Sequence, residues 1–193
     1  MHLEQVTAPT SEPISLAEAK LHCRVDVSDD DTWFTTAIAA ARRCAETQCD
    51  RCFVTQTWRQ TRDGFPSCDA RGSIVLAKTP VASVSSVKYI DADGVLQTLD
   101  ASKYTADTLA DPCEIVPAYG ESWPSTRAVP NAVTVEYVVG VAAEQVDPRA
   151  KMAMLLTVAH WYENRESVLV GTVSKEIELA FRHLAAQMWN GTL

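Results

Sequence analysis

The residues best suited to chemistry are Cys49 and Cys52, which are separated by Asp50 and Arg51. This spacing is typical of half a zinc site or of a redox-active thiol pair. A structural zinc site needs four converging ligands, and the other cysteines offer no second pair. The two thiols also fall at the predicted end of a helix, where the helix dipole raises the pKa of a thiol. We therefore expect no metal and no cofactor, and interpret both cysteines as buried small side chains.

Other catalytic patterns are missing from the sequence. His160 precedes Glu163 and Glu166, whereas zinc proteases need two histidines four residues apart. The segment Gly120–Pro124 does not match the Gly-x-Ser-x-Gly pattern of a nucleophile elbow. The sequence therefore predicts no catalytic residue and a protein that is not an enzyme. The alternative is a cytosolic enzyme that uses a thiol or a metal at Cys49 and Cys52.

Charge and hydropathy restrict the class of protein further. The 193 residues are 47% hydrophobic and carry a net charge of −8, whereas a general polyanion binder needs a basic face. No apolar run reaches the roughly 18 residues of a membrane span, and the N-terminus lacks a basic start followed by an apolar centre. We expect a protein made in the cytoplasm that does not enter a membrane, with its six cysteines as free thiols.

Two helical stretches would have to position these residues. Ser15 and Glu18 have the spacing of a capping box, and Asp147-Pro148 has the residue types of a helix start. Apolar residues at intervals of three and four predict helices near residues 16–24, 30–51, 148–165 and 175–190. In the third helix the inward face is predicted to comprise Met152, Leu155, Leu156, Ala159 and Tyr162.

Between the helical stretches the hydrophobic period changes to two. Val133, Val135, Tyr137 and Val139 alternate with polar residues, and Asp93-Gly94 predicts a tight hairpin. Because no helix separates the predicted strands, we expect a small antiparallel sheet and an α+β fold. The predicted organisation is a helical core of residues 1–52 and 147–193 with a β subdomain inserted at residues 53–146.

Four segments of the chain together resemble one known family. They are Pro13–Lys20 followed by Asp29–Asp31; Pro80–Tyr89 with Asp93-Gly94 and Tyr104; Trp123-Pro124 with Pro130–Tyr137; and His160–Glu166. In order and spacing, over nearly the full chain, they resemble the head-tail connector (adaptor, or head completion) proteins of long-tailed bacteriophages and gene transfer particles. In that family these segments are the opening helices, a Pro-x-x-x-Val-x-x-Val hairpin, the last strand and the end of the long helix.

The resemblance implies a structural virion protein of the phage neck. Such a protein forms a ring, usually of twelve subunits, under the portal, extends the DNA channel and joins head to tail through a further neck or stopper protein. The family's C-terminal segment reaches the portal. In this chain that role falls on the face of the predicted last helix, and its candidate portal-docking residues are Phe181, Leu184, Met188 and Trp189.

Ring closure requires two different faces that fit each other on every subunit. The sorted charges of the first half of the chain suggest such faces, and the candidate inter-subunit residues are Asp29, Asp30, Asp31, Arg42, Arg43 and Arg51. An ordinary solvated helix surface also accounts for this sorting. We expect DNA to pass through an acidic ring without specific binding. A nucleic-acid-binding module that uses the arginines between Arg42 and Arg62 is the other alternative.

Overall fold

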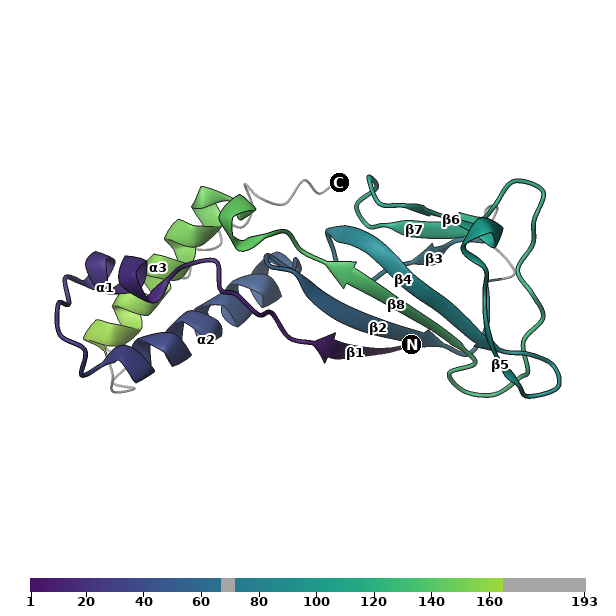
Figure 1. Ribbon diagram of the computed structural model, residues 1–193, viewed down its shortest axis with the longest axis horizontal. Helices are drawn as coiled ribbons and strands as arrows, with labels where there is room; N and C mark the ends of the chain where they lie inside the picture. The colour runs from purple at the N-terminus through teal and green to yellow at the C-terminus, as the bar shows by residue number, and fades with distance from the viewer. Residues whose placement is uncertain (67–71, 165–193) are drawn as a thin grey trace. The chain divides into compact units, whose positions relative to one another are not determined.

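The computed structural model describes residues 1–66 and 72–164 (Figure 1). The chain forms two compact units, which we describe separately. The β unit comprises Met1–Thr10 and Thr55–Val141, and the helical unit comprises Ser11–Val54 and the chain from Ala142. The α+β class expected from the sequence is confirmed.

The N-terminus differs from the sequence prediction, which placed residues 1–52 in the helical core. Residues Met1–Thr10 belong to the β unit. Strand β1 (His2–Thr7) pairs with strand β2 (Gln56–Arg62) in antiparallel register, with Glu4 opposite Arg59. The apolar residues of β1, Leu3 and Val6, are three positions apart, so the strand lacks the alternation of apolar and polar residues by which a strand is recognised in a sequence.

The larger sheet of the β unit has the strand order β1-β2-β8-β4-β5. Its remaining strands are β4 (Val81–Ile90), β5 (Leu96–Thr98) and β8 (Val133–Val139), and all its pairings are antiparallel. The alternation predicted for β8 is confirmed, because Val133, Val135, Tyr137 and Val139 are buried and the residues between them are half-buried.

A three-stranded sheet completes the β unit in the order β3-β7-β6. Its strands are β3 (Ile74–Val75), β6 (Tyr104–Asp107) and β7 (Glu114–Pro117), with a short 3₁₀ helix, η1, at Ala101–Lys103. The buried amide of Gln60 links the two sheets. Its Nε2 donates to the Val75 carbonyl over 2.9 Å, and its Oε1 accepts from the Ala77 N–H over 2.9 Å.

The hairpin predicted at Asp93-Gly94 joins β4 to β5. The Asp91 N–H donates to the Val95 carbonyl, and the Gly94 N–H donates back to the Asp91 carbonyl, each over 3.0 Å. Gly94 has a φ of +89°, a conformation that side-chain-bearing residues rarely adopt. The carboxylate of Asp91 also accepts from the N–H groups of Asp93 and Val95, so the turn is held by local hydrogen bonds.

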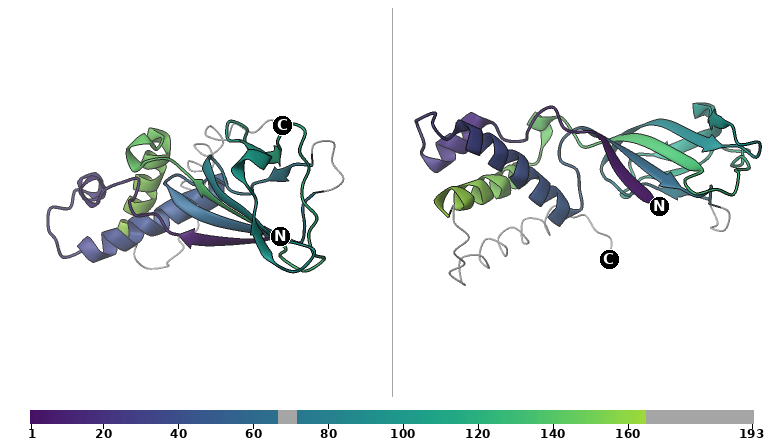
Figure 2. Two further views of the ribbon diagram at one scale, coloured as in Figure 1. Left: turned by 45° about the vertical axis from the view of Figure 1, so that its right-hand side comes forward. Right: turned by 90° about the horizontal axis from the view of Figure 1, so that it is seen from below.

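The helical unit contains α1 (Leu16–Cys23), α2 (Asp31–Cys49) and α3 (Pro148–Glu163), which is preceded by a 3₁₀ helix, η2, at Ala143–Gln145 (Figure 2). The predicted capping box is present: Ser15 Oγ accepts from the Glu18 N–H, and the Glu18 carboxylate accepts from the Ser15 N–H. Asp147 caps α3 by accepting from the Arg149 N–H. The helix predicted near residues 175–190 lies outside the described residues.

The core-facing side of α3 differs from the prediction. Met152 and Leu156, predicted to point inward, are 48% and 40% exposed, whereas Met154 and Val158 are buried. Since α3 is apolar on more than one side, its sequence alone does not identify the side that packs against α2. Near the end of α3, Tyr162 stacks on Phe34 of α2 with ring centroids 4.9 Å apart.

Candidate functional site

Arg42, a candidate inter-subunit residue, lies inside the helical unit. Only 4% of the residue is exposed. Its Nε donates to Glu12 Oε2 over 2.7 Å and its Nη1 to Glu46 Oε2 over 2.8 Å. Glu46 also accepts from the Phe53 N–H over 2.9 Å, so the cluster joins the chain before α1, the middle of α2 and the chain after α2. Both partners of the Arg42 guanidinium therefore lie within the subunit, and the inter-subunit role expected of Arg42 stays a prediction.

The electrostatics of this cluster agree with its geometry. Burial alone lowers the pKa of the Arg42 guanidinium, but the hydrogen bonds and charges of Glu12 and Glu46 outweigh that effect and raise the pKa. The guanidinium is therefore charged at every ordinary pH. Glu46 stands four residues after Arg42, a spacing at which side chains on a helix meet, so this ion pair could be predicted from the sequence. Glu12 is thirty residues from Arg42, and nothing in the sequence indicated that the two side chains pair.

Two of the three candidate aspartates also have partners within the subunit. Asp31 Oδ1 forms a 2.6 Å ion pair with Lys20 Nζ of α1. Asp30 Oδ2 accepts from the Tyr162 hydroxyl of α3 over 2.9 Å. Asp30 stands at the N-cap position of α2 without a side-chain cap hydrogen bond, so its carboxylate joins two helices instead of satisfying the amides at the start of α2.

The other candidate inter-subunit residues are more accessible. Asp29 and Arg43 are exposed, and Arg51 is half-buried. Arg43 lies on the outer side of α2, among the small side chains of Thr36, Ala40 and Thr47. Of the six candidates, Asp29 and Arg43 are therefore best placed to meet another molecule.

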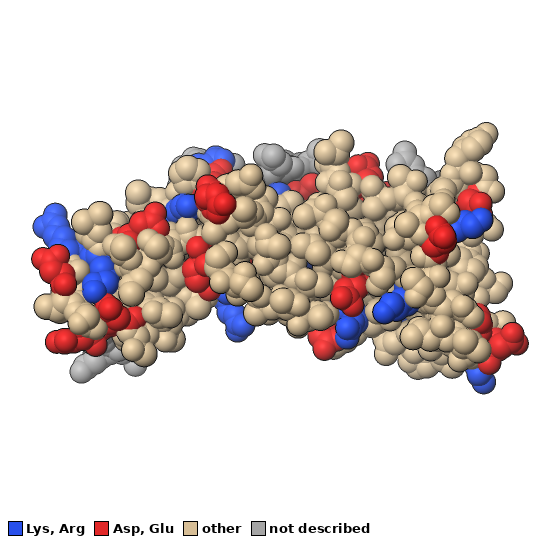
Figure 3. Space-filling view, viewed as in Figure 1, with Lys and Arg blue, Asp and Glu red and all other residues tan. Residues whose placement is uncertain are grey.

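The arginines between Arg42 and Arg62 are divided between the two units. Arg42, Arg43 and Arg51 belong to the helical unit, whereas Arg59 and Arg62 belong to the β unit. Arg59 lies between two carboxylates, with Nη1 3.1 Å from Glu4 Oε2 and Nη2 3.4 Å from Glu136 Oε2. On the face shown in Figure 3, blue groups are interspersed with red ones over the described residues of each unit.

The thiols of Cys49 and Cys113 are buried. Burial raises the pKa of Cys49, although nearby Arg51 opposes it, and burial with the nearby Asp107 and Glu114 charges raises the pKa of Cys113 to about 11. A raised pKa leaves little thiolate, the reactive form. Among the described residues, no group of three or more His, Cys, Asp or Glu side chains could hold a metal ion. In the same part of the chain, no helix is long and apolar enough to cross a membrane.

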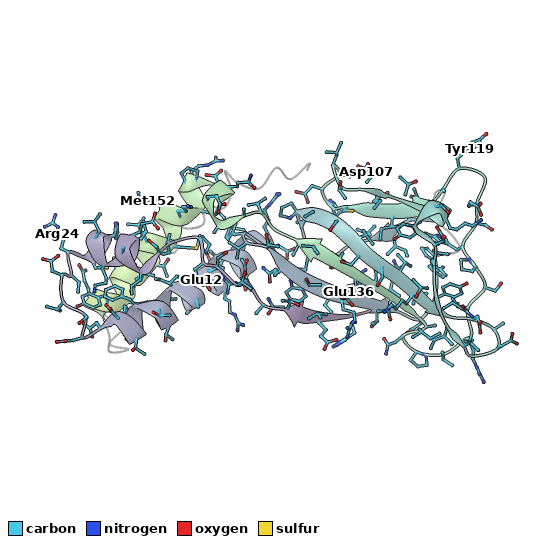
Figure 4. All side chains as sticks on the ribbon, viewed as in Figure 1. Glu12, Arg24, Asp107, Tyr119, Glu136 and Met152 are labelled. Carbon is cyan, nitrogen blue, oxygen red and sulfur yellow. The ribbon has the colours of Figure 1, made fainter. Side chains whose placement is uncertain are left out.

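Two exposed apolar side chains were not identified from the sequence. Leu109 is 97% exposed between β6 and β7, and Tyr119 is fully exposed after β7, as Figure 4 shows for Tyr119. Neither residue belongs to a periodic apolar pattern, so the sequence gave no signal that would mark either side chain. The four candidate portal-docking residues, Phe181, Leu184, Met188 and Trp189, lie outside the described residues.

The fold of this chain is similar to that of chains in several solved structures. A chain of a structure titled as the virion of a native gene transfer agent (GTA) particle aligns with a TM-score of 0.79 and 19% identity, over 100% of this chain and 97% of that one. The chain has the fold of a GTA particle component. Chains from the neck of an empty GTA particle, computed with C6 symmetry, and of a native one, computed with C12 symmetry, give TM-scores of 0.74 and 0.73.

The two neck chains are 20% and 19% identical to this chain, and the alignments cover 95% and 100% of it and 95% and 97% of the neck chains. The similarity therefore extends over both units and is not confined to one of them. No protein-family model matches the sequence, and no curated protein matches it.

Proposed function

We propose that this chain is a structural protein of the head-tail neck of a phage or phage-like particle. In this proposal it forms a ring under the portal, extends the DNA channel and joins the head to the tail, so that its final location is the virion. The observation that supports this most strongly is the alignment over nearly the whole length with chains from GTA necks.

The symmetries of the similar structures support a ring of twelve subunits. One neck was computed with C6 symmetry and another with C12 symmetry, and a ring of twelve is compatible with both. A ring built from identical chains uses a heterologous contact, in which one face of each subunit meets a different face of its neighbour. We place this contact on the helical unit, with Arg43 and Asp29 as opposing charges.

A structural role without catalysis agrees with the chemistry of the described side chains. The thiol- or metal-dependent alternative needs an accessible low-pKa thiol or a ligand cluster at Cys49 and Cys52, but both side chains are buried and the pKa of Cys49 is raised. The nucleic-acid-binding alternative needs clustered arginines, but Arg42 and Arg59 are each engaged by two carboxylates. In the proposed ring, DNA passes without specific binding because a subunit with a charge of −8 repels phosphates.

Contact with the portal is assigned to the C-terminal segment, with Phe181, Leu184, Met188 and Trp189 as the docking residues. The test is electron microscopy of the purified chain alone and mixed with the portal protein of the same particle. We expect rings on the portal vertex. A chain that stays monomeric and unbound beside an intact portal, or one that turns over a small substrate, would refute the proposal.

A charge exchange tests the contact between subunits. Arg43→Glu should weaken ring assembly on the portal, because it places like charges opposite each other, and adding Asp29→Arg should restore it. Gln48→Glu is the matched control, since it adds negative charge to an exposed position of the same helix. Assembly that is unchanged by Arg43→Glu, or not restored by the second substitution, would remove this pair from the interface.

A further inference from the structure

The β unit presents two apolar side chains on loops that are held in shape. Tyr119 occupies the second position of a turn in which the Glu121 N–H donates to the Ala118 carbonyl over 2.9 Å. Gly120 follows it with a φ of +80°, as a type II turn requires. The turn exposes Tyr119 completely (Figure 4).

Both ends of this turn are attached to Lys103, the last residue of η1, immediately before strand β6. The Ala118 N–H donates to the Lys103 carbonyl over 3.0 Å, and Lys103 Nζ pairs with Glu121 Oε1 over 2.8 Å. Because the backbone around Tyr119 is ordered by these bonds, little conformational entropy would be lost when the ring is buried against another molecule.

Leu109 is presented in a similar way at the opposite end of the β6–β7 ladder. The carboxylate of Asp107 accepts from the N–H groups of Leu109 and Ala110, which fixes the turn. The ladder runs from the pair Tyr104 and Pro117 to the pair Asp107 and Glu114, three residue steps or roughly 10 Å. Two apolar anchors therefore stand at the two ends of one short sheet.

The chain segment that carries these anchors is acidic. From Asp100 to Glu121 the chain carries one lysine, Lys103, and five acidic residues: Asp100, Asp107, Asp111, Glu114 and Glu121. Such a segment repels nucleic acid and anionic lipid alike, whereas it complements a protein surface that is rich in lysine and arginine. Exposed apolar side chains within a polar rim are typical of protein interaction sites.

We propose that Leu109 and Tyr119 are anchors for a second protein, which receives them in apolar recesses bordered by basic side chains. We name the next neck protein on the tail side as that partner. This identification rests on the proposed function, which assigns the helical unit to ring contacts and the C-terminal segment to the portal, and leaves the β unit for the tail side.

The test uses full-length rings assembled on the portal, and the purified tail-side neck protein of the same particle as the probe. Tyr119→Ser and Leu109→Ser should each lower the affinity for the probe about tenfold or more, as expected for anchor residues. Leu96→Ser is the matched control, since Leu96 is also exposed, at 65%, on another strand of the β unit. It should leave the affinity unchanged.

Charge supplies a second measurement on the same rings. Glu114→Lys should weaken binding of the probe at low salt, and the affinity of the wild-type ring should fall as salt increases. Rings that form normally but do not bind the probe, or whose Tyr119→Ser and Leu109→Ser variants bind it like the wild type, would overturn this inference alone. Failure of the wild-type chain to form rings on the portal would instead overturn the proposed function and the partner named from it.

Discussion

Replacing Arg42 by alanine should strongly destabilise the helical unit. The substitution leaves the carboxylates of Glu12 and Glu46 without their shared cation, and the side chain of Glu46 is only 12% exposed. Breaking a buried ion pair on one side costs roughly 3–5 kcal/mol. Since the side chain of Glu12 is 29% exposed and regains some water, we expect about 3 kcal/mol. This is a large part of the roughly 5–15 kcal/mol that stabilises a folded domain.

The assay is urea unfolding of the full chain, followed by the helical circular dichroism signal. Arg42→Lys should cost less, about 1–2 kcal/mol, because it keeps the charge but loses the planar fork that meets both carboxylates. Arg42→Met with Glu46→Gln should recover part of the loss, since the buried carboxylate is neutralised while an acceptor for the Phe53 N–H remains.

Arg43→Ala is the control, as Arg43 is the exposed neighbour on the same helix. Its free energy of unfolding should stay within about 0.5 kcal/mol of the wild type. If Arg42→Ala behaved like Arg43→Ala, or if the double variant were less stable than Arg42→Ala, the assignment of Arg42 as the buried link between these segments would be wrong.

Three further predictions concern local contacts. Ser15→Ala should destabilise the protein by about 0.5–2 kcal/mol in urea unfolding through loss of the capping box. Hydrogen bonds from the Ser15 N–H and hydroxyl lower the pKa of Glu18 below 4.5, so the stabilisation from this carboxylate should be present above that pH and fade as the pH falls through the lower folded-state pKa. In the variant, stability should depend less steeply on pH over this range. Tyr162→Phe should cost about 1.5–3 kcal/mol by the same assay, since it removes a hydrogen bond to the Asp30 carboxylate. Cys113, whose pKa is raised to about 11, should resist iodoacetamide at pH 8 in the folded protein and react in urea, as peptide mass spectrometry would reveal; rapid labelling without urea would contradict its burial.

Features that were predicted correctly from the sequence involve residues that are close together in the chain. The capping box of Ser15 and Glu18, the hairpin at Asp93-Gly94 and the alternation in β8 were all predicted, and each is present. In these cases the signal and the structure involve residues within a few positions of each other. Local sequence is sufficient there because turn and cap geometry follow from the conformational preferences of those residues.

The errors fall where residues far apart in the chain meet. The charge of Arg42 suggested a surface position, but Glu12, thirty residues earlier, pairs with it in the core. The apolar residues of strand β1 do not follow a period of two, and only its pairing with β2 makes it part of a sheet. The inward side of α3 depended on where α2 and α1 pack, which no single-helix pattern specifies.

The α+β class, the capped starts of α1 and α3, the hairpin at Asp93-Gly94 and strand β8 were determined by the sequence alone, because hydrophobic period, caps and turn residues act over a few positions. The placement of each charge was decided only by the tertiary structure. Whether a carboxylate or a guanidinium meets water or its opposite charge depends on which distant segments fold beside it, and that is why Asp30, Asp31 and Arg42 hold the helical unit together while Asp29 and Arg43 stay on its surface.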